Sequence, residues 1–312
     1  MSENFYTEIT ENFTSLEILA SQVVEGFITG LHKSPFHGFS VEFAEYRPYN
    51  TGESIRHIDW KLLGKTDKLF VKRYEEETNL RCCILLDVSS SMYFPIPEKN
   101  TKNKPNKITF SIYAAAALMQ LLVKQRDAVG FVSFSDTIEE QTELKSNSAH
   151  LRHLFTQLQT YLPNEKQNAL HKGSNIAQTL HTLAEQIHKR SLIIIFSDMF
   201  ENIEDFESLF TALQHLKYKK NEVLLFHVYD QDKEMAFDFE NRPYRFVDME
   251  SSMEIKLNPS QIRTKYINAI ENFHAQLKIK CEQYQIDFIE ANIQDGFIPI
   301  LQAYLLKRQK LW

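Results

Sequence analysis

Hydrophobic and polar positions change their period near residue 80, and the C-terminal part alternates two patterns. Short, continuously apolar runs of strand length alternate with longer stretches whose apolar residues recur at helical spacing. The expected strands are Cys82–Leu86, Ala128–Phe134, Ser191–Phe196, Val223–Tyr229 and Ile286–Ala291, and the expected helices are Lys107–Lys124, Ala149–Leu162, Asn175–His188, Glu204–Leu216, Asn258–Tyr284 and Pro299–Lys310. Strands that are apolar throughout are covered on both faces, so the pattern predicts a parallel sheet between helical layers.

The first 79 residues follow a different pattern. Apolar residues between positions 5 and 32 recur at helical spacing, and the stretch Pro35–Glu77 is polar and irregular. Short β-like segments around Asn241-Arg242-Pro243 predict a small inserted hairpin near residues 235–249. We therefore expect an N-terminal helix and irregular arm over residues 1–79 and one domain over residues 80–312. The predicted fold class of that domain is α/β, a three-layer, doubly wound, mostly parallel sheet.

Oxygen-bearing side chains lie where ligands bind in open parallel sheets, just after the strands end. Asp87, Ser89 and Ser91 come directly after the first buried strand, Ser174 opens a predicted helix, and Asp198 follows a second buried strand. Carboxylate and hydroxyl oxygens are ligands that Mg²⁺ accepts. The sequence therefore predicts a divalent-metal site for Mg²⁺, with Mn²⁺ or Ca²⁺ as alternatives because similar oxygen ligands suit all three.

Turn formation and helix capping are the competing interpretation of these residues. The string Asp-x-Ser-x-Ser has little weight alone, since about one random chain in ten of this length would contain it. Its position after a buried strand favours metal binding, as do Ser174 and Asp198 at the same predicted sheet edge.

The stretch Leu85–Met92, LLDVSSSM, resembles the metal-ion-dependent adhesion site of von Willebrand factor type A domains. In that family one loop supplies an Asp and two Ser, a later loop a Thr, and a strand end an Asp. The resemblance assigns these roles to Asp87, Ser89, Ser91, Ser174 and Asp198, with Ser in place of Thr at position 174. It implies that a partner protein's carboxylate fills the ion's open position, which is recognition and not catalysis.

Residues 40–92, including Arg47-Pro48-Tyr49, Arg56–Lys61 and Glu75–Glu77, resemble the bacterial domain-of-unknown-function 58 family. Members of that family are commonly found with MoxR-type AAA+ ATPases. The resemblance therefore implies such an ATPase as partner, and an adaptor or co-chaperone role. Many relatives carry N-terminal membrane segments, and this sequence has no apolar window of that length, so we expect no membrane span.

Composition adds limits on partners and compartment. The formal net charge of -6 gives no reason to expect nucleic acid as a ligand. Basic and aromatic residues of the arm alternate with acids, so ion pairs are a better explanation of them than a nucleic-acid groove. The 3 cysteines lack disulfide or zinc-ligand spacing, and the N-terminus lacks the features of a secretory signal. These features predict a cytoplasmic protein.

A metal-dependent phosphatase-like hydrolase that uses Asp87 and Asp198 is the alternative function. Such an enzyme normally needs a general acid or base two residues beyond the nucleophile, and Ser89 does not serve at neutral pH. Neither a P-loop nor a Gly-x-Ser-x-Gly elbow occurs in the sequence. We therefore expect no enzyme and no catalytic residues. Metal-dependent phosphate release from generic esters, abolished by Asp87→Ala, would favour the alternative.

Overall fold

A computed structural model of the 312-residue chain describes residues 16–32, 46–48, 60–66, 68–72, 80–96, 105–163, 175–199, 206–249 and 253–310. The chain divides into two compact units, residues 28–79 and residues 1–27 together with 80–312. The sequence assigns the whole N-terminal helix to the arm, whereas α2 (Leu16–His32) belongs to the larger unit as far as Phe27. The apolar stripe of α2, which includes Leu19 and Val24, is buried, as expected for a helix that packs into the larger unit.

The smaller unit contains short regular elements in the stretch that the sequence predicts as irregular. Strand β1 (Tyr46–Pro48) pairs antiparallel with β2 (Phe70–Lys72), and helix α3 (Trp60–Thr66) lies between them in the chain. These elements are too short for hydrophobic periodicity to reveal them.

The larger unit is built on a six-stranded sheet in the described part of the chain. Its strand order is β10-β7-β6-β3-β4-β5, with bounds β3 (Arg81–Asp87), β4 (Ala128–Phe134), β5 (Ile138–Gln141), β6 (Leu192–Ser197), β7 (Glu222–Tyr229) and β10 (Asp287–Asn292). Neighbouring strands are parallel except β5, which runs antiparallel to β4. This mixed, mostly parallel sheet between helices confirms the predicted α/β three-layer class. The sequence does not reveal β5, because its residues are mostly polar and the strand is only half-buried on one face.

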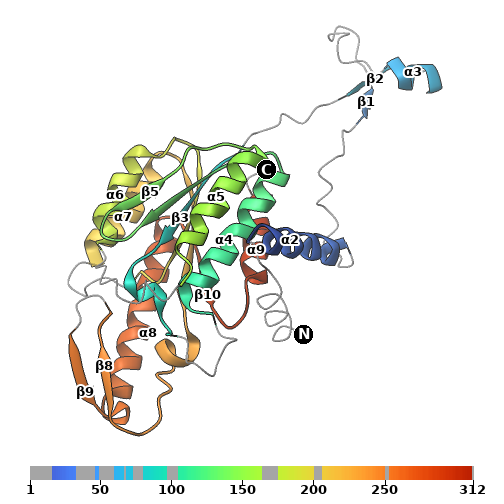
Figure 1. Cartoon of the computed structure of the whole chain (residues 1–312). Coiled ribbons are helices and arrows are strands. Elements are labelled where there is room, and N and C mark those ends of the chain that lie inside the picture. Colours follow the sequence, from blue (N-terminus) through green and yellow to red (C-terminus); the bar gives the residue numbers. More distant parts are fainter. Residues whose placement is uncertain are drawn as a thin grey trace. The chain divides into compact units, whose positions relative to one another are not determined.

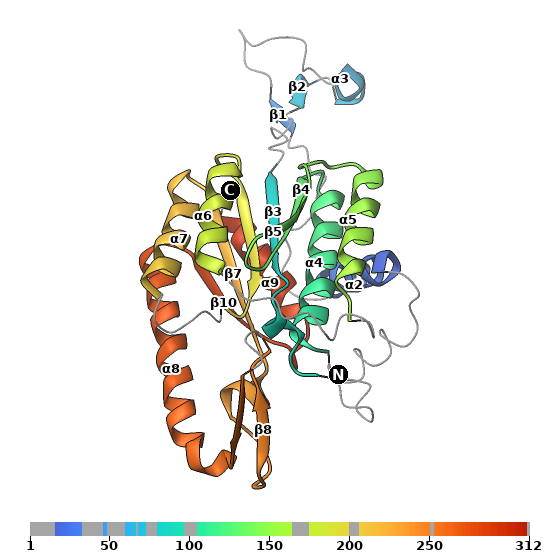
Figure 2. The same ribbon diagram turned by 60° about the vertical axis from the view of Figure 1, so that its left-hand side comes forward.

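Two helical layers enclose the sheet (Figures 1 and 2). Helices α6 (Ile176–Gln186), α7 (Phe206–Tyr218) and α8 (Pro259–Gln283) cover one face, and α4 (Lys107–Lys124), α5 (Ser148–Thr160) and α9 (Ile298–Lys310) cover the other. Leu85 of β3 and Ile195 of β6 pack into the core under the first layer, together with Leu180, Leu213 and Leu277 from its three helices. The sheet is therefore buried on both sides, as its apolar strands require.

Helix α4 is apolar on most of its surface because it lies at the centre of the second layer. Among the described residues it is the one helix long and apolar enough to cross a membrane, and 72% of that stretch is buried inside the fold. This burial is what a central core helix of a globular domain shows.

The chain reverses its winding direction between β3 and β6. From β3 it passes through α4 to β4 on one side, and from β6 it passes through α7 to β7 on the other. The carboxyl ends of β3 and β6 therefore border a topological switch point, the place where open α/β sheets bind ligands.

The inserted hairpin lies farther along the chain than the predicted position near residues 235–249. A π-helical turn, η4 (Gln231–Met235), follows β7, and the hairpin pairs β8 (Tyr244–Val247) with β9 (Glu254–Leu257). Phe237 and Phe239 alternate as strand residues do, yet they lie in coil. The Phe237 ring packs 4.4 Å from that of Tyr266, which explains the apolar alternation without a strand. The hairpin extends past the end of the sheet at which β3 finishes (Figures 1 and 2).

An ion pair at the opposite, amino end of the sheet gives a stability test. Asp127 is buried, accepts a hydrogen bond from the Leu80 backbone at 3.2 Å and pairs with Arg308 of α9. Arg308→Met leaves the Asp127 carboxylate buried without its cation, so the free energy of unfolding should fall by about 3 kcal/mol in urea denaturation. Arg245→Met is the matched control, because its pair with Glu254 has side chains 62% and 46% exposed. Its loss should stay below about 1 kcal/mol, and equal losses in the two variants would contradict the argument.

Candidate metal centre

Asp87 is the last residue of β3, and its carboxylate is buried and fixed on both oxygens. The Ser89 backbone N–H donates to Oδ1 at 2.9 Å, and the Ser197 hydroxyl donates to Oδ2 at 2.6 Å. Ser197 ends the adjacent strand β6, and its Oγ accepts from the Met199 backbone at 2.8 Å. The position of Asp87 is thus determined jointly by two neighbouring strands.

The loop after β3 brings two hydroxyls next to this carboxylate. Its first residue, Val88, donates to the Phe134 carbonyl of β4 at 2.8 Å, and a 3-10 turn, η2 (Ser90–Tyr93), follows. The hydroxyl oxygens of Ser89 and Ser91 lie 3.0 Å apart, within hydrogen-bond distance. The alternating spacing of Asp87, Ser89 and Ser91 therefore gathers their side chains, as the sequence predicts.

Asp198 lies directly after β6, fully buried, and its carboxylate is held by a buried lysine. Lys107 Nζ donates to Asp198 Oδ2 at 2.7 Å and also to Glu234 Oε1. The Lys107, Asp198 and Glu234 side chains are 1%, 0% and 11% exposed, so the ammonium is shared between two carboxylates away from solvent. Glu234 belongs to η4, and its second oxygen accepts from the Asp230 backbone at 2.8 Å.

Burial and charge together shift the ionisation of this cluster. Burial, reinforced by the charge of Asp198, raises the pKa of Asp87 to about 6, against the hydrogen bonds from Ser197 and Ser89. Burial alone would lower the pKa of Lys107, but the charges of Asp198 and Glu234 outweigh it and raise that pKa above its usual value. Lys107 is therefore an ammonium at neutral pH, and Asp87 carries a buried negative charge that its hydrogen bonds only partly offset.

His227 of β7 lies in register with Ser197 but adds no charge to the site. Neither of its ring nitrogens has a hydrogen-bond partner among the described residues, and burial followed by the neighbouring His274 lowers its pKa to about 3. The neutral ring packs 4.9 Å from that of His274. His227 therefore contributes no charge to the site at neutral pH.

The predicted ligands meet different outcomes. Asp87, Ser89 and Ser91 lie together, and Asp198 follows the strand beside them, close enough for its charge to act on Asp87. Ser174 lies outside the described residues. In the described ranges no group of three or more His, Cys, Asp and Glu side chains could hold a metal ion. The donor set instead combines carboxylates with hydroxyls, and these hard oxygens fit Mg²⁺ chemistry.

The sequence interpretation missed three residues that shape the site: Ser197, Lys107 and Glu234. Lys107 begins helix α4, where the helix dipole disfavours a cation, and this misplacement is a signal readable in sequence. Glu234 follows the apolar strand β7 by five residues, which gives a weaker signal. Ser197 is the buried last residue of β6, and its position in the strand gives no sequence signal of a separate role in the site.

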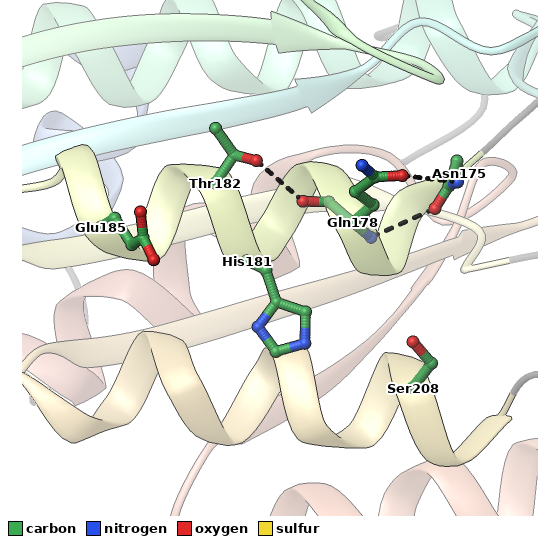
Figure 3. Close-up of a pocket in the computed structure, with 6 residues that line it drawn as sticks. All are labelled: Asn175, Gln178, His181, Thr182, Glu185 and Ser208. Atoms are coloured by element: carbon green, nitrogen blue, oxygen red, sulfur yellow. Dashed lines mark hydrogen bonds between the residues drawn. The ribbon is translucent and has the colours of Figure 1, made fainter.

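A surface pocket lies elsewhere, between α6 and α7, with a volume of about 390 Å³ (Figure 3). Its lining is Asn175, Gln178, His181, Thr182, Glu185 and Ser208. Several of these polar groups already bond along their own helix: Asn175 Oδ1 accepts from the Gln178 backbone and Thr182 donates to the Gln178 carbonyl (Figure 3). The pocket contains none of the predicted ligands.

The fold and its buried polar edge define an α/β protein with a candidate metal centre at a topological switch point. Residues 45–276 match the family described as protein of unknown function DUF58, so the chain belongs to that family. This confirms the family resemblance seen in residues 40–92.

Uncharacterized proteins of Mycobacterium bovis and Mycobacterium tuberculosis are each 22% identical over 184 residues, which cover 59% of this chain and 55% of theirs. The chain thus spans about half the length of the curated relatives it matches. Among solved structures, the conserved hypothetical protein BatB from Bacteroides thetaiotaomicron is 13% identical with a TM-score of 0.45, over 74% of this chain and 99% of that one. An aerotolerance-related membrane protein from Bacteroides fragilis is 14% identical with a TM-score of 0.39, over 73% and 99%.

The hydrogen bond from Ser197 to Asp87 gives a test of the site's construction. Ser197→Ala removes a donor from a buried carboxylate, so the free energy of unfolding at pH 7 should fall by about 1.5–3 kcal/mol. Ser111→Ala is the matched control, since the buried Ser111 hydroxyl donates at 2.8 Å to the neutral carbonyl of Lys107. Its cost should be about 1 kcal/mol or less. A smaller loss for Ser197→Ala than for Ser111→Ala would show that the Asp87 charge does not depend on this contact.

Proposed function

We propose that this chain is a metal-dependent protein–protein interaction module with a von Willebrand factor type A-like adhesion site. The proposed ligands of Mg²⁺, or alternatively Mn²⁺ or Ca²⁺, are Asp87, Ser89, Ser91, Ser174 and Asp198. The observation that carries the proposal is the buried Asp87 carboxylate at the switch point, beside the paired hydroxyls of Ser89 and Ser91. The bound ion would supply a Lewis-acidic position for a carboxylate of the partner.

The surrounding residues support recognition better than turnover. Ser197 and the Ser89 backbone orient Asp87 and leave it no role as a mobile base. The hydrolase alternative with Asp87 and Asp198 gains one favourable feature, the Lys107 ammonium, which in principle could neutralise a phosphoryl oxygen. Two carboxylates already hold that ammonium, however, and so we propose a binding protein rather than an enzyme.

The proposed partner is a MoxR-type AAA+ ATPase, with the chain acting as its adaptor or co-chaperone. The resemblance of residues 40–92 to this family implies such a partner, and the match of residues 45–276 shows that the chain belongs to the family. The hairpin β8–β9 extends past the same end of the sheet as the candidate site, and it carries exposed Val247 and Ile255 that could add to a protein contact. A cytoplasmic location and the absence of nucleic-acid ligands remain predictions.

Metal binding is the first test of this proposal. Isothermal titration of the wild-type chain with MgCl₂ or MnCl₂ should show a single site, and Asp87→Asn should abolish it because the amide keeps the shape but removes the charge. Asp136→Asn is the matched control, since Asp136 is an exposed carboxylate just after the neighbouring strand β4. It should bind like wild type. A wild-type chain that binds neither ion, or an Asp87→Asn variant that binds normally, would refute the site.

Partner capture is the second test. A MoxR-type AAA+ ATPase of the same organism should co-elute with the wild-type chain on size exclusion in Mg²⁺ and separate from it in EDTA. Asp87→Asn should fail to co-elute in either buffer, whereas Asp136→Asn should behave like wild type. Co-elution that persists in EDTA would show an interaction independent of the metal site.

A further inference from the structure

The buried cluster of Lys107, Asp198 and Glu234 joins three elements that are distant in the chain. Lys107 is the first residue of α4, Asp198 follows β6, and Glu234 lies in η4. The ammonium lies 2.7 Å from Asp198 Oδ2, and Glu234 is itself fixed by the Asp230 backbone at 2.8 Å. The Lys107 ammonium thus binds the carboxylate of Asp198, which is also a proposed metal ligand, and so competes with the metal ion for it.

Acidic side chains outnumber basic ones at this buried edge. Asp87, Asp198 and Glu234 contribute three carboxylates and Lys107 one ammonium, and a further buried carboxylate, that of Asp230, follows β7 beside Glu234. In a buried site charge interactions are weakly screened, so every charge near the ion contributes to its affinity. Glu234 is not a proposed ligand, but its carboxylate shares the Lys107 ammonium with Asp198 and so reduces the neutralisation of Asp198.

We propose that Lys107 and Glu234 set the metal affinity of the site in opposite directions. This inference rests on the proposed metal site. Lys107 is a tethered cation that lowers the affinity, because it neutralises Asp198 and repels the incoming ion. Glu234 raises the affinity, because it neutralises part of the Lys107 ammonium and leaves Asp198 more anionic. Neither residue is a proposed ligand: Glu234 acts through Lys107, and Lys107 acts through Asp198 and by repelling the ion.

A charge series on the full chain tests the inference by isothermal titration with MgCl₂. Lys107→Met should bind Mg²⁺ at least about tenfold more tightly than wild type, and Glu234→Gln at least about tenfold more weakly. The double variant Lys107→Met with Glu234→Gln restores the wild-type net charge, so its affinity should return to within about threefold of wild type. A merely structural role of the cluster would not produce shifts of opposite sign.

Lys307→Met is the matched control for loss of a lysine shared by two carboxylates. Lys307 Nζ lies 2.7 Å from both Glu222 and Asp287, and these residues begin β7 and β10 at the amino end of the sheet. The Lys307→Met variant should be less stable than wild type. It should still bind Mg²⁺ within about twofold of wild type, because the length of the sheet separates Lys307 from the candidate site by more than a Debye length of about 8 Å. If Lys107→Met does not fold, Glu234→Gln and the double variant still distinguish a charge effect from a structural one.

The outcomes separate the two proposals. A wild-type chain that does not bind Mg²⁺ refutes the metal site itself. A wild-type chain that binds, with Glu234→Gln unchanged or tighter, or with a double variant as weak as Glu234→Gln, overturns the roles of Lys107 and Glu234 and leaves the site intact. A second readout is the rise in Tm on adding Mg²⁺, which should be largest in Lys107→Met and smallest in Glu234→Gln.

Discussion

Two carboxylates, those of Asp87 and Asp198, end adjacent parallel strands inside the protein, and the burial of like charges side by side constrains everything around them. Each must be compensated, because an uncompensated buried charge costs several kcal/mol. Asp87 receives hydrogen bonds from its own loop and from Ser197 of the next strand. Asp198 receives the Lys107 ammonium. The carboxyl edge of the sheet therefore carries a set of buried polar contacts in addition to its apolar packing.

This constraint also explains two features that are unfavourable by themselves. A lysine at the first position of α4 opposes the helix dipole, and it is tolerated because two carboxylates surround its ammonium. The π-helical turn after β7 is a rare conformation, and it carries Glu234 to that ammonium. Local preferences thus yield at this edge to the charges of Asp198 and Lys107. Such local exceptions are common where a fold carries a functional site.

The hydrophobic pattern predicted the larger unit well wherever an element is buried on most of its surface. Helix α4 spans the predicted Lys107–Lys124, and β4 spans the predicted Ala128–Phe134. Prediction failed at β5, whose residues are mostly polar, and at Phe237 and Phe239, whose alternation reflects rings packed from coil rather than a strand. Periodicity records which side chains are buried, and it does not record the backbone pairing that buries them.

The sequence by itself determined the grouping of Asp87, Ser89 and Ser91, because these residues are two positions apart in one loop and chain geometry keeps them together. Only the tertiary structure decided the rest. Asp198 meets Lys107 across 91 positions of sequence, and Lys107 meets Glu234 across 127. These contacts depend on β6 lying next to β3 and on the chain winding outward in both directions from that point. Strand order is a property of the whole sheet, so no local pattern could reveal which charges would share the same buried edge.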